Sequence, residues 1–261
     1  MSVVNKRQLV FALAAGLVVG FAAGFFFADR ANRKELDRLR AEIAHAHNAP
    51  APSDASKAGN STNANTEKTS LTDDELRNVV AKADARPDDH ELQRKVGQGL
   101  YLYAVQFGKP DLLPEAIRIL RRAHTAAPQD YDTTVVLGNA LFDLARATDP
   151  KRFKEARDYF TQALRQKPDD INVRTELGAT YYFDTPADPR RAITEYRKSL
   201  AQDPHHEMTL QSLVAALIST GELTEAEQRL NELQNVNPTN PALSDLRAQL
   251  AQQRNAAGGQ K

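Results

Sequence analysis

The residues of this chain that could do acid–base or metal chemistry are scattered along it. Its six histidines are His45, His47, His90, His124, His205 and His206. The first two stand two residues apart, so on a helix they would point to different sides and could not share a ligand. The others fall at the predicted start or end of a helix, or in the turn after Pro204. We therefore expect no metal site.

Sequence motifs of catalytic sites are also missing. The chain has no HExxH, GxxxxGK or GxSxG motif, and no dinucleotide-binding fingerprint after a strand. It has no cysteine, which excludes disulfides, thiolate nucleophiles, thiolate metal sites and a lipoprotein anchor on an acylated cysteine. We expect no catalytic residue, no bound cofactor and no enzymatic activity.

The net charge of the chain bears on whether its partner is a nucleic acid. The chain carries 34 basic and 34 acidic side chains and has no net charge. Nucleic-acid-binding proteins are typically basic, so no nucleic-acid partner is expected.

A short basic segment, residues 1–8, precedes twenty residues without a charge, 9–28. As a helix this run is about 30 Å long, enough to cross the hydrocarbon core of a bilayer. The alternative is a cleaved signal peptide, but its apolar region is usually about 7–15 residues long. We predict a transmembrane signal anchor that binds the lipid bilayer.

The side of the membrane is less well defined by the sequence. Five basic residues follow the run within residues 30–40, which favours a cytoplasmic C-terminal side. A short basic N-terminus also resembles an ordinary export signal, and long domains often cross regardless of flanking charge. We expect a bacterial inner-membrane protein with its folded part in the periplasm.

Gly16, Gly20 and Gly24 are four residues apart and share one side of the predicted membrane helix. Small residues at this spacing let two membrane helices approach closely, which predicts self-association. The alternative is that glycine is simply common in membrane helices.

Three further segments follow the anchor. Residues 29–49 predict a charged juxtamembrane helix, and residues 50–69 a flexible linker, because they lack large apolar groups. Folded structure is expected from about Ser70, with Thr72 and Glu75 as a capping box for a helix running toward Ala85.

Beyond this point one pattern recurs four times. Prolines 87, 128, 168, 204 and 238 are separated by 41, 40, 36 and 34 residues. Twelve residues before the last four stand Ala116, Ala156, Ala192 and Ala226, each followed four residues later by Leu120, Phe160, Tyr196 or Leu230. The equivalent first helices carry Val96-Gly97, Leu137-Gly138, Leu177-Gly178 and Leu213-Val214.

This pattern resembles the tetratricopeptide repeat family from about Asp88 to Asn240. The resemblance implies an all-α solenoid of about four helical hairpins with flanking helices, over residues 70–254, behind the N-terminal transmembrane helix. Small residues let the two helices of a hairpin cross closely, large residues fill the gaps, proline ends the second helix and the following acids cap the next. Residues 241–253 predict a C-terminal capping helix, and residues 255–261 a disordered tail.

In this family the first helix of each hairpin lines a concave groove that receives a peptide or helix. The equivalent positions here are Glu91, Arg94, Gln98, Tyr101, Val135, Asn139, Phe142, Thr175, Ala179, Tyr182, Met208, Gln211 and Ala215. Tyr101, Phe142 and Tyr182 are equivalent, which predicts an aromatic row that either binds a partner or packs between repeats. Chaperone-binding members of the family grip a terminal carboxylate, and Arg94, Gln98 and Asn139 fit that scheme. Thr175 and Ala179 stand where further basic residues are expected, so the clamp would be incomplete.

Two departures from the family pattern are Val214 in place of glycine and Ser199 in place of alanine. The first three repeats also have extra residues between their helices, which predicts either projecting loops or longer helices.

These features predict a membrane-anchored scaffold or adaptor whose groove binds a protein partner. One alternative is similarity to the repeat proteins of cytochrome c maturation, which hold apocytochrome for haem attachment. Another is a subunit of an enzyme complex.

Overall fold

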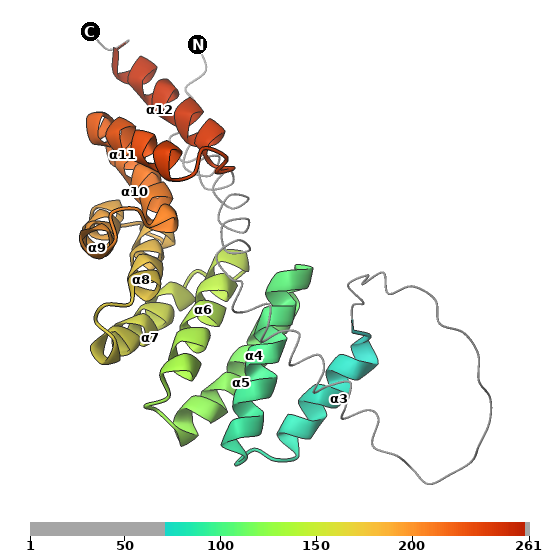
Figure 1. Ribbon diagram of the computed structural model, residues 1–261. Helices are drawn as coiled ribbons and strands as arrows, with labels where there is room; N and C mark the ends of the chain where they lie inside the picture. The colour runs from blue at the N-terminus through green and yellow to red at the C-terminus, as the bar shows by residue number, and fades with distance from the viewer. Residues whose placement is uncertain (1–70, 259–261) are drawn as a thin grey trace, which may run out of the picture. The chain divides into compact units, whose positions relative to one another are not determined.

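The computed structural model describes residues 71–258, which are α-helical with short connections and contain no strand (Figure 1). They form two compact units, residues 71–127 and 128–258. Within the described range no helix is long and apolar enough to cross a membrane. The predicted anchor 9–28 with Gly16, Gly20 and Gly24, the juxtamembrane helix 29–49 and the linker 50–69 lie outside the described residues.

The first unit is a helical hairpin preceded by one helix. Its elements are α3 (Asp73–Asp84), α4 (His90–Phe107), the short 3-10 helix η1 (Pro110–Leu112) and α5 (Leu113–Ala126). Helix α4 packs along α5, and α3 packs against α4. The predicted capping box is confirmed: Thr72 Oγ1 accepts from the Glu75 amide, and the Glu75 carboxylate accepts from the Thr72 amide at 2.7 Å.

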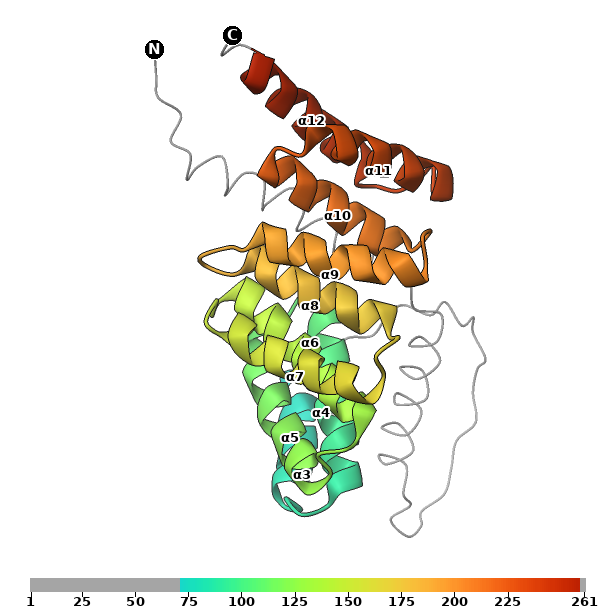
Figure 2. The same cartoon turned by 90° about the vertical axis from the view of Figure 1, so that its left-hand side faces the viewer.

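The second unit stacks three hairpins and a final helix. Its helices are α6 (Tyr131–Ala147), α7 (Arg152–Gln166), α8 (Ile171–Phe183), α9 (Pro189–Gln202), α10 (Glu207–Thr220), α11 (Leu223–Val236) and α12 (Leu243–Gly258). The first helices α6, α8 and α10 contact one another in sequence and form one row, while α7, α9 and α11 lie on its other side (Figures 1 and 2). We call the side of α6, α8 and α10 that faces away from α7, α9 and α11 the inner face.

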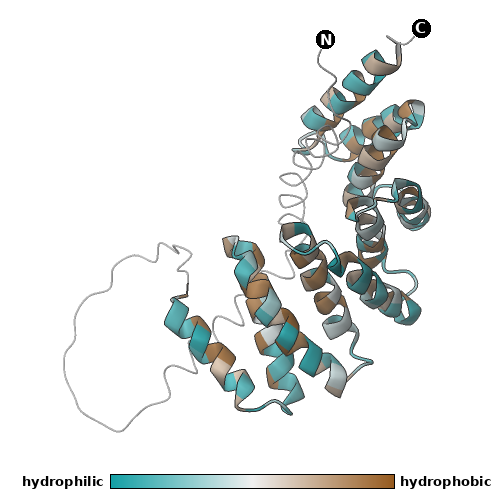
Figure 3. Ribbon diagram, turned by 180° about the vertical axis from the view of Figure 1, so that it is seen from behind, coloured by the Kyte–Doolittle hydropathy of each residue, from teal (hydrophilic) through white to brown (hydrophobic). Residues whose placement is uncertain are grey.

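Most helices carry both polar and apolar residues (Figure 3), whereas α10 is buried continuously from Thr209 to Ile218. The mixed composition places one side of a helix in the core and leaves the other side to solvent.

Proline and aspartate define the helix boundaries as predicted. Helices α5, α7, α9 and α11 each end two residues before a proline of the repeat. Asp89, Asp130 and Asp170 then cap the next helix, and Asp170 Oδ1 accepts from the Val173 amide at 2.9 Å. Helix α10 differs, because His206 stands at its N-cap and makes no side-chain cap.

The close crossing of the hairpin helices is explained by the repeat glycines. A Cβ added at Gly97 would lie 2.7 Å from Leu120, one at Gly138 2.7 Å from Phe160, and one at Gly178 2.6 Å from Tyr196. These partners are the large residues of the repeat pattern, and all three are fully buried. The prediction that small residues admit large ones is confirmed.

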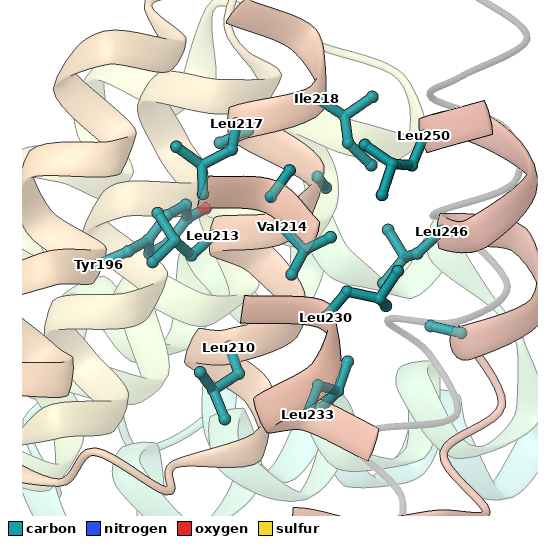
Figure 4. Close-up of a cluster of buried hydrophobic side chains, with 14 of the residues drawn as sticks. Tyr196, Leu210, Leu213, Val214, Leu217, Ile218, Leu230, Leu233, Leu246 and Leu250 are labelled. Carbon is teal, nitrogen blue, oxygen red and sulfur yellow. The ribbon is translucent and has the colours of Figure 1, made fainter. Parts of the chain in front are cut away.

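The C-terminal core continues into α12. Leu243, Leu246 and Leu250 of this helix are buried against α10 and α11, in a cluster that also contains Val214 and Leu230 (Figure 4). Helix α12 extends to Gly258, so residues 255–258 are helical and not part of the predicted tail; residues 259–261 lie outside the described range.

The extra residues of the first three repeats are used in two ways. Helices α4 and α6 are 18 and 17 residues long, against 13 and 14 for α8 and α10. The first two insertions therefore mostly lengthen a helix, whereas the third forms the connection 184–188. Arg157 fixes that connection by an ion pair with Asp184 at 2.6 Å.

Candidate functional site

The predicted groove residues differ widely in exposure. Those that are exposed or partly exposed are Glu91, Arg94, Gln98, Val135, Asn139, Tyr182 and Met208. Those that are buried are Tyr101, Phe142, Thr175, Ala179, Gln211 and Ala215. Glu91, Arg94, Gln98 and Tyr101 belong to the unit 71–127, and the others to the unit 128–258.

The aromatic row is not a continuous exposed surface. Tyr101 is 2% exposed and Phe142 is 4% exposed, whereas Tyr182 is partly exposed. The Phe142 ring packs edge-on against Phe153 and Phe183, at centroid distances of 5.6 and 6.1 Å. For Phe142 the packing alternative is therefore the one observed.

An aromatic and charged cluster lies where α6 meets α8. The guanidinium of Arg146 lies 4.9 Å from the centre of the Phe183 ring and 5.8 Å from that of Phe142. Tyr182 and Phe183 meet edge to face at 5.1 Å. Burial lowers the pKa of Arg146, while Asp143 and Glu176 act in the opposite direction.

Glu176 is the most unusual ionisable group of this cluster. It is only 7% exposed. Burial raises the pKa of Glu176 to about 8; Asp143 acts in the same direction and Arg146 in the opposite one. At neutral pH this side chain is therefore mostly protonated.

Two tyrosine hydroxyls hydrogen-bond serines of α10. Tyr182 hydrogen-bonds Ser219, and burial raises its pKa to about 12. Tyr196 of α9 hydrogen-bonds Ser212, and burial, Glu176 and Tyr182 raise the pKa of Tyr196. Tyr196 is fully buried where α9 meets α8, so its hydroxyl belongs to the packing between these helices and α10.

A second polar group joins the N-terminal ends of α8 and α10. The Thr175 and Thr209 hydroxyl oxygens are 2.6 Å apart, and Thr209 Oγ1 is also 2.6 Å from His206 Nδ1. Ser199, the unexpected serine, is buried beside them at 3.4 Å from Thr175. His206 is therefore not the freely exposed turn residue that the sequence suggested, because its Nε2 also lies 3.1 Å from Asn172.

The residues considered for a carboxylate clamp are engaged within the chain. Arg94 pairs with Glu91 at 2.8 Å and lies 3.5 Å from the Gln98 side-chain oxygen. This pairing lowers the pKa of Glu91 to about 2. Thr175 and Ala179 are buried, so they add nothing to such a clamp. Residues 71–258 also contain no group of three or more side chains arranged to hold a metal ion.

The groove positions predicted from the sequence do not include Glu176, Arg146, Asp143 or Phe183, because they were taken from the family's groove pattern alone. One signal was available. Glu176 is the single charged residue in Thr175–Phe183, a stretch otherwise made of small, apolar and aromatic residues. An acid inside such a run is a candidate for a buried, perturbed group.

The repeats can be compared with known families. Residues 187–250 match the model of the tetratricopeptide repeat. This part of the chain therefore carries tetratricopeptide repeats. The predicted all-α repeat fold is thereby confirmed.

Several solved structures share this fold. YrrB, described as a tetratricopeptide repeat protein with an unusual peptide-binding site, is 15% identical with a TM-score of 0.52, covering 67% of this chain and 82% of that one. A tetratricopeptide repeat protein of Thermus thermophilus is 18% identical with a TM-score of 0.50, covering 69% and 89%. MamA of Desulfovibrio magneticus is 16% identical with a TM-score of 0.51, covering 64% and 85%. At these identities the likeness is one of fold.

One relative is similar in sequence. A probable biofilm formation methyltransferase, WspC of Pseudomonas putida, is 31% identical over 120 residues. The match covers 46% of this chain and only 28% of the length of that protein.

Proposed function

We propose that this tetratricopeptide repeat protein is a non-enzymatic scaffold that binds a peptide or helix of another protein on the inner face of α6, α8 and α10. The observation that carries the proposal is a set of partly exposed aromatic and charged side chains on α6 and α8. Tyr182, Phe183 and Arg146 are partly exposed and packed together. Aromatic residues and arginine are enriched where proteins recognise partners, since they combine large contact area with a polar group.

The proposal is tested by photocrosslinking in intact cells. A photoreactive residue replaces Tyr182 or Asn139, both partly exposed and predicted to line the groove. The control position is Thr161, exposed on α7, a second helix. We expect the same partner from both groove positions and not from Thr161. Equal labelling from all three positions, or none from the groove, contradicts the proposal.

The identity of the recovered partner separates the alternatives. An apocytochrome c would support a role in cytochrome c maturation. A stoichiometric enzyme subunit would support membership of an enzyme complex.

The proposal includes a membrane anchor at residues 9–28, with the repeats in the periplasm of a bacterium. Its support is the uncharged run of twenty residues. Deleting residues 9–28 should move the protein from the membrane to the soluble fraction. Protease added to spheroplasts should then remove the repeats of the full-length protein, and protection would place them in the cytoplasm.

A further inference from the structure

Helix α10 has an unusual composition for a helix that lines a groove. Between Glu207 and Glu222 it carries no charged residue on any of its sides. Its described neighbours are α8, α9, α11 and α12, and the sides that pack against them require apolar residues. A side that meets only water normally carries charged or strongly polar groups instead. The inner face of α10 is therefore suited to an apolar neighbour.

The uncharged surface continues from α10 onto α8. The groove positions predicted on these two helices carry no charge, and we call them the uncharged strip: Thr175, Ala179, Tyr182, Met208, Gln211 and Ala215. Tyr182 and Met208 are partly exposed, and Ser219, which hydrogen-bonds Tyr182, is exposed, so the strip reaches the surface. In the first repeat, by contrast, the equivalent positions include Glu91 and Arg94. Charge on this side of the repeats is thus confined to the earlier helices.

We propose that the uncharged strip binds residues 9–28 of the same chain when these residues are not in a bilayer. The inference rests on the proposed function, which makes the inner face a binding surface and residues 9–28 a membrane anchor. This run has no charge and many large apolar side chains, so its exposure to water is unfavourable. An uncharged helix face is the surface of this chain that covers such a run without burying an unpaired charge.

The chain outside the described structure is long enough for this contact. Residues 29–70 join the run to Leu71, the first described residue. Fully extended, they span up to about 140 Å. That is several times the radius of gyration of about 16 Å expected for a compact domain of this size. Attachment to the same chain also raises the effective concentration of the run to about the millimolar range, which favours it over the run of a second copy.

Because the chain has no cysteine, the contact can be tested by disulfide formation between two introduced cysteines. One replaces Ser219 beside the strip. The other is placed in turn at residues 18 to 21, so that every side of the run is sampled. The full-length protein is made by cell-free synthesis without membranes and oxidised, and the linked residues are identified by mass spectrometry.

The matched control replaces Thr161, which is exposed on α7, in place of Ser219. We expect a disulfide within one molecule to form at least about tenfold faster with Ser219→Cys than with Thr161→Cys, because docking holds the run beside α10. Phosphatidylcholine vesicles should reduce the faster rate to that of the control, since the bilayer and the strip compete for the same run.

A charge in the strip provides a second comparison. Met208→Glu, at a partly exposed position, should slow formation of the disulfide with Ser219→Cys about tenfold, whereas Thr194→Glu, exposed on α9, should leave the rate unchanged. Circular dichroism checks that both variants fold, and the comparison of Ser219 with Thr161 does not depend on either of them.

Three results overturn the proposal: equal rates for Ser219 and Thr161, disulfides that join only two different molecules, or a fast rate that vesicles do not reduce. The first shows that the run does not dock, and the second that a second copy supplies it. The crosslinking experiment in cells is independent of these results. A partner recovered at Tyr182 would still identify a scaffold even if residues 9–28 never bind the strip.

Discussion

At the scale of single residues, a position without a side chain can be as constrained as one with a large side chain. Gly97 and Gly99 are two residues apart in α4 but have different surroundings. A Cβ at Gly97 would meet the Leu120 side chain at 2.7 Å and the Leu120 backbone nitrogen at 3.1 Å, whereas nothing lies within 4 Å of a Cβ at Gly99. Side chains can adjust but backbone atoms cannot move cheaply, so the first position is constrained and the second is not.

Gly97→Ala should therefore destabilise the fold by about 1–3 kcal/mol, the usual cost of overpacking. Gly99→Ala should instead stabilise it by up to about 1 kcal/mol, because alanine is the better helix former. Urea denaturation of the two variants measures both effects. If both substitutions change stability in the same direction, the close contact with Leu120 does not constrain α4.

Glu176 gives a pH-dependent prediction at the same scale. The pKa of this group is about 8 in the folded protein and about 4.5 in an unfolded chain. The fold therefore binds its proton more tightly, and the stability this contributes is present below about pH 4.5 and is lost as pH rises toward 8. The slope is at most about 1.4 kcal/mol per pH unit for one proton.

Glu176→Gln, which mimics the protonated acid, should lose this dependence and become increasingly more stable than the wild type from pH 5 to pH 9. The groups that face Glu176 are Asp143 and Arg146 of α6 and Tyr196 of α9. Urea denaturation at pH 5, 7 and 9 provides the comparison. Parallel stability curves for the two proteins would contradict the raised pKa.

At the scale of the helices, neighbouring repeats are joined by hydroxyl groups as well as by apolar packing. Thr175 donates to the Ile171 carbonyl at 2.8 Å, so its oxygen is left to accept from Thr209. Thr209 is completely buried, and its hydroxyl oxygen also lies 2.6 Å from His206 Nδ1. The Thr209 hydroxyl therefore links Thr175 of α8 to His206 at the start of α10.

Thr209→Val preserves volume but removes both contacts, so it should cost about 1–3 kcal/mol by leaving buried partners unsatisfied. Thr175→Val in the same protein removes one of those partners. The double variant should thus lose less stability than the two single variants together, by about 0.5 kcal/mol or more. Thermal or urea unfolding of the four proteins completes the cycle. Additive losses would show that the two threonines act independently.

The helices also show which features can be predicted from the sequence and which cannot. The helix boundaries and the glycine–ring contacts could be predicted, because proline, aspartate and small residues act on their immediate neighbours. The burial of Phe142 and Thr175 could not, because it depends on how closely α8 lies against α6 and α10. Glu176 was missed for the same reason, since its pKa depends on α6 and α9 as much as on α8.

At the scale of the whole molecule, a repeat stack must end somewhere without exposing its core. Helix α12 does this at the C-terminal end. Leu246 is 1% exposed against the last hairpin, while Gln252 lies on the solvent side of the same helix. The apolar side of α12 therefore covers the last described hairpin.

Leu246→Ala should destabilise the protein by about 2–5 kcal/mol, as for other large-to-small changes in a core. Gln252→Ala, on the outer side, should change stability by less than about 0.5 kcal/mol. Unfolding of both variants in urea, with light scattering to detect association, tests the capping role. Similar small effects of the two substitutions would mean that α12 is dispensable.

The contacts of Gly138 with Phe160 and of Gly178 with Tyr196 restrict how such a chain can evolve. A larger residue at either glycine is excluded while its ring is present, yet a smaller residue in place of the ring would first leave a void. In the last repeat Val214 stands at the glycine position, and Leu230 stands at the position of the ring. The first-helix residue is thus larger than glycine, and its partner is smaller than phenylalanine or tyrosine. A change from glycine with a ring to valine with leucine passes through a sequence whose core is either overpacked or has a cavity. The two positions of a repeat should therefore change together across related sequences, and such changes should be rare.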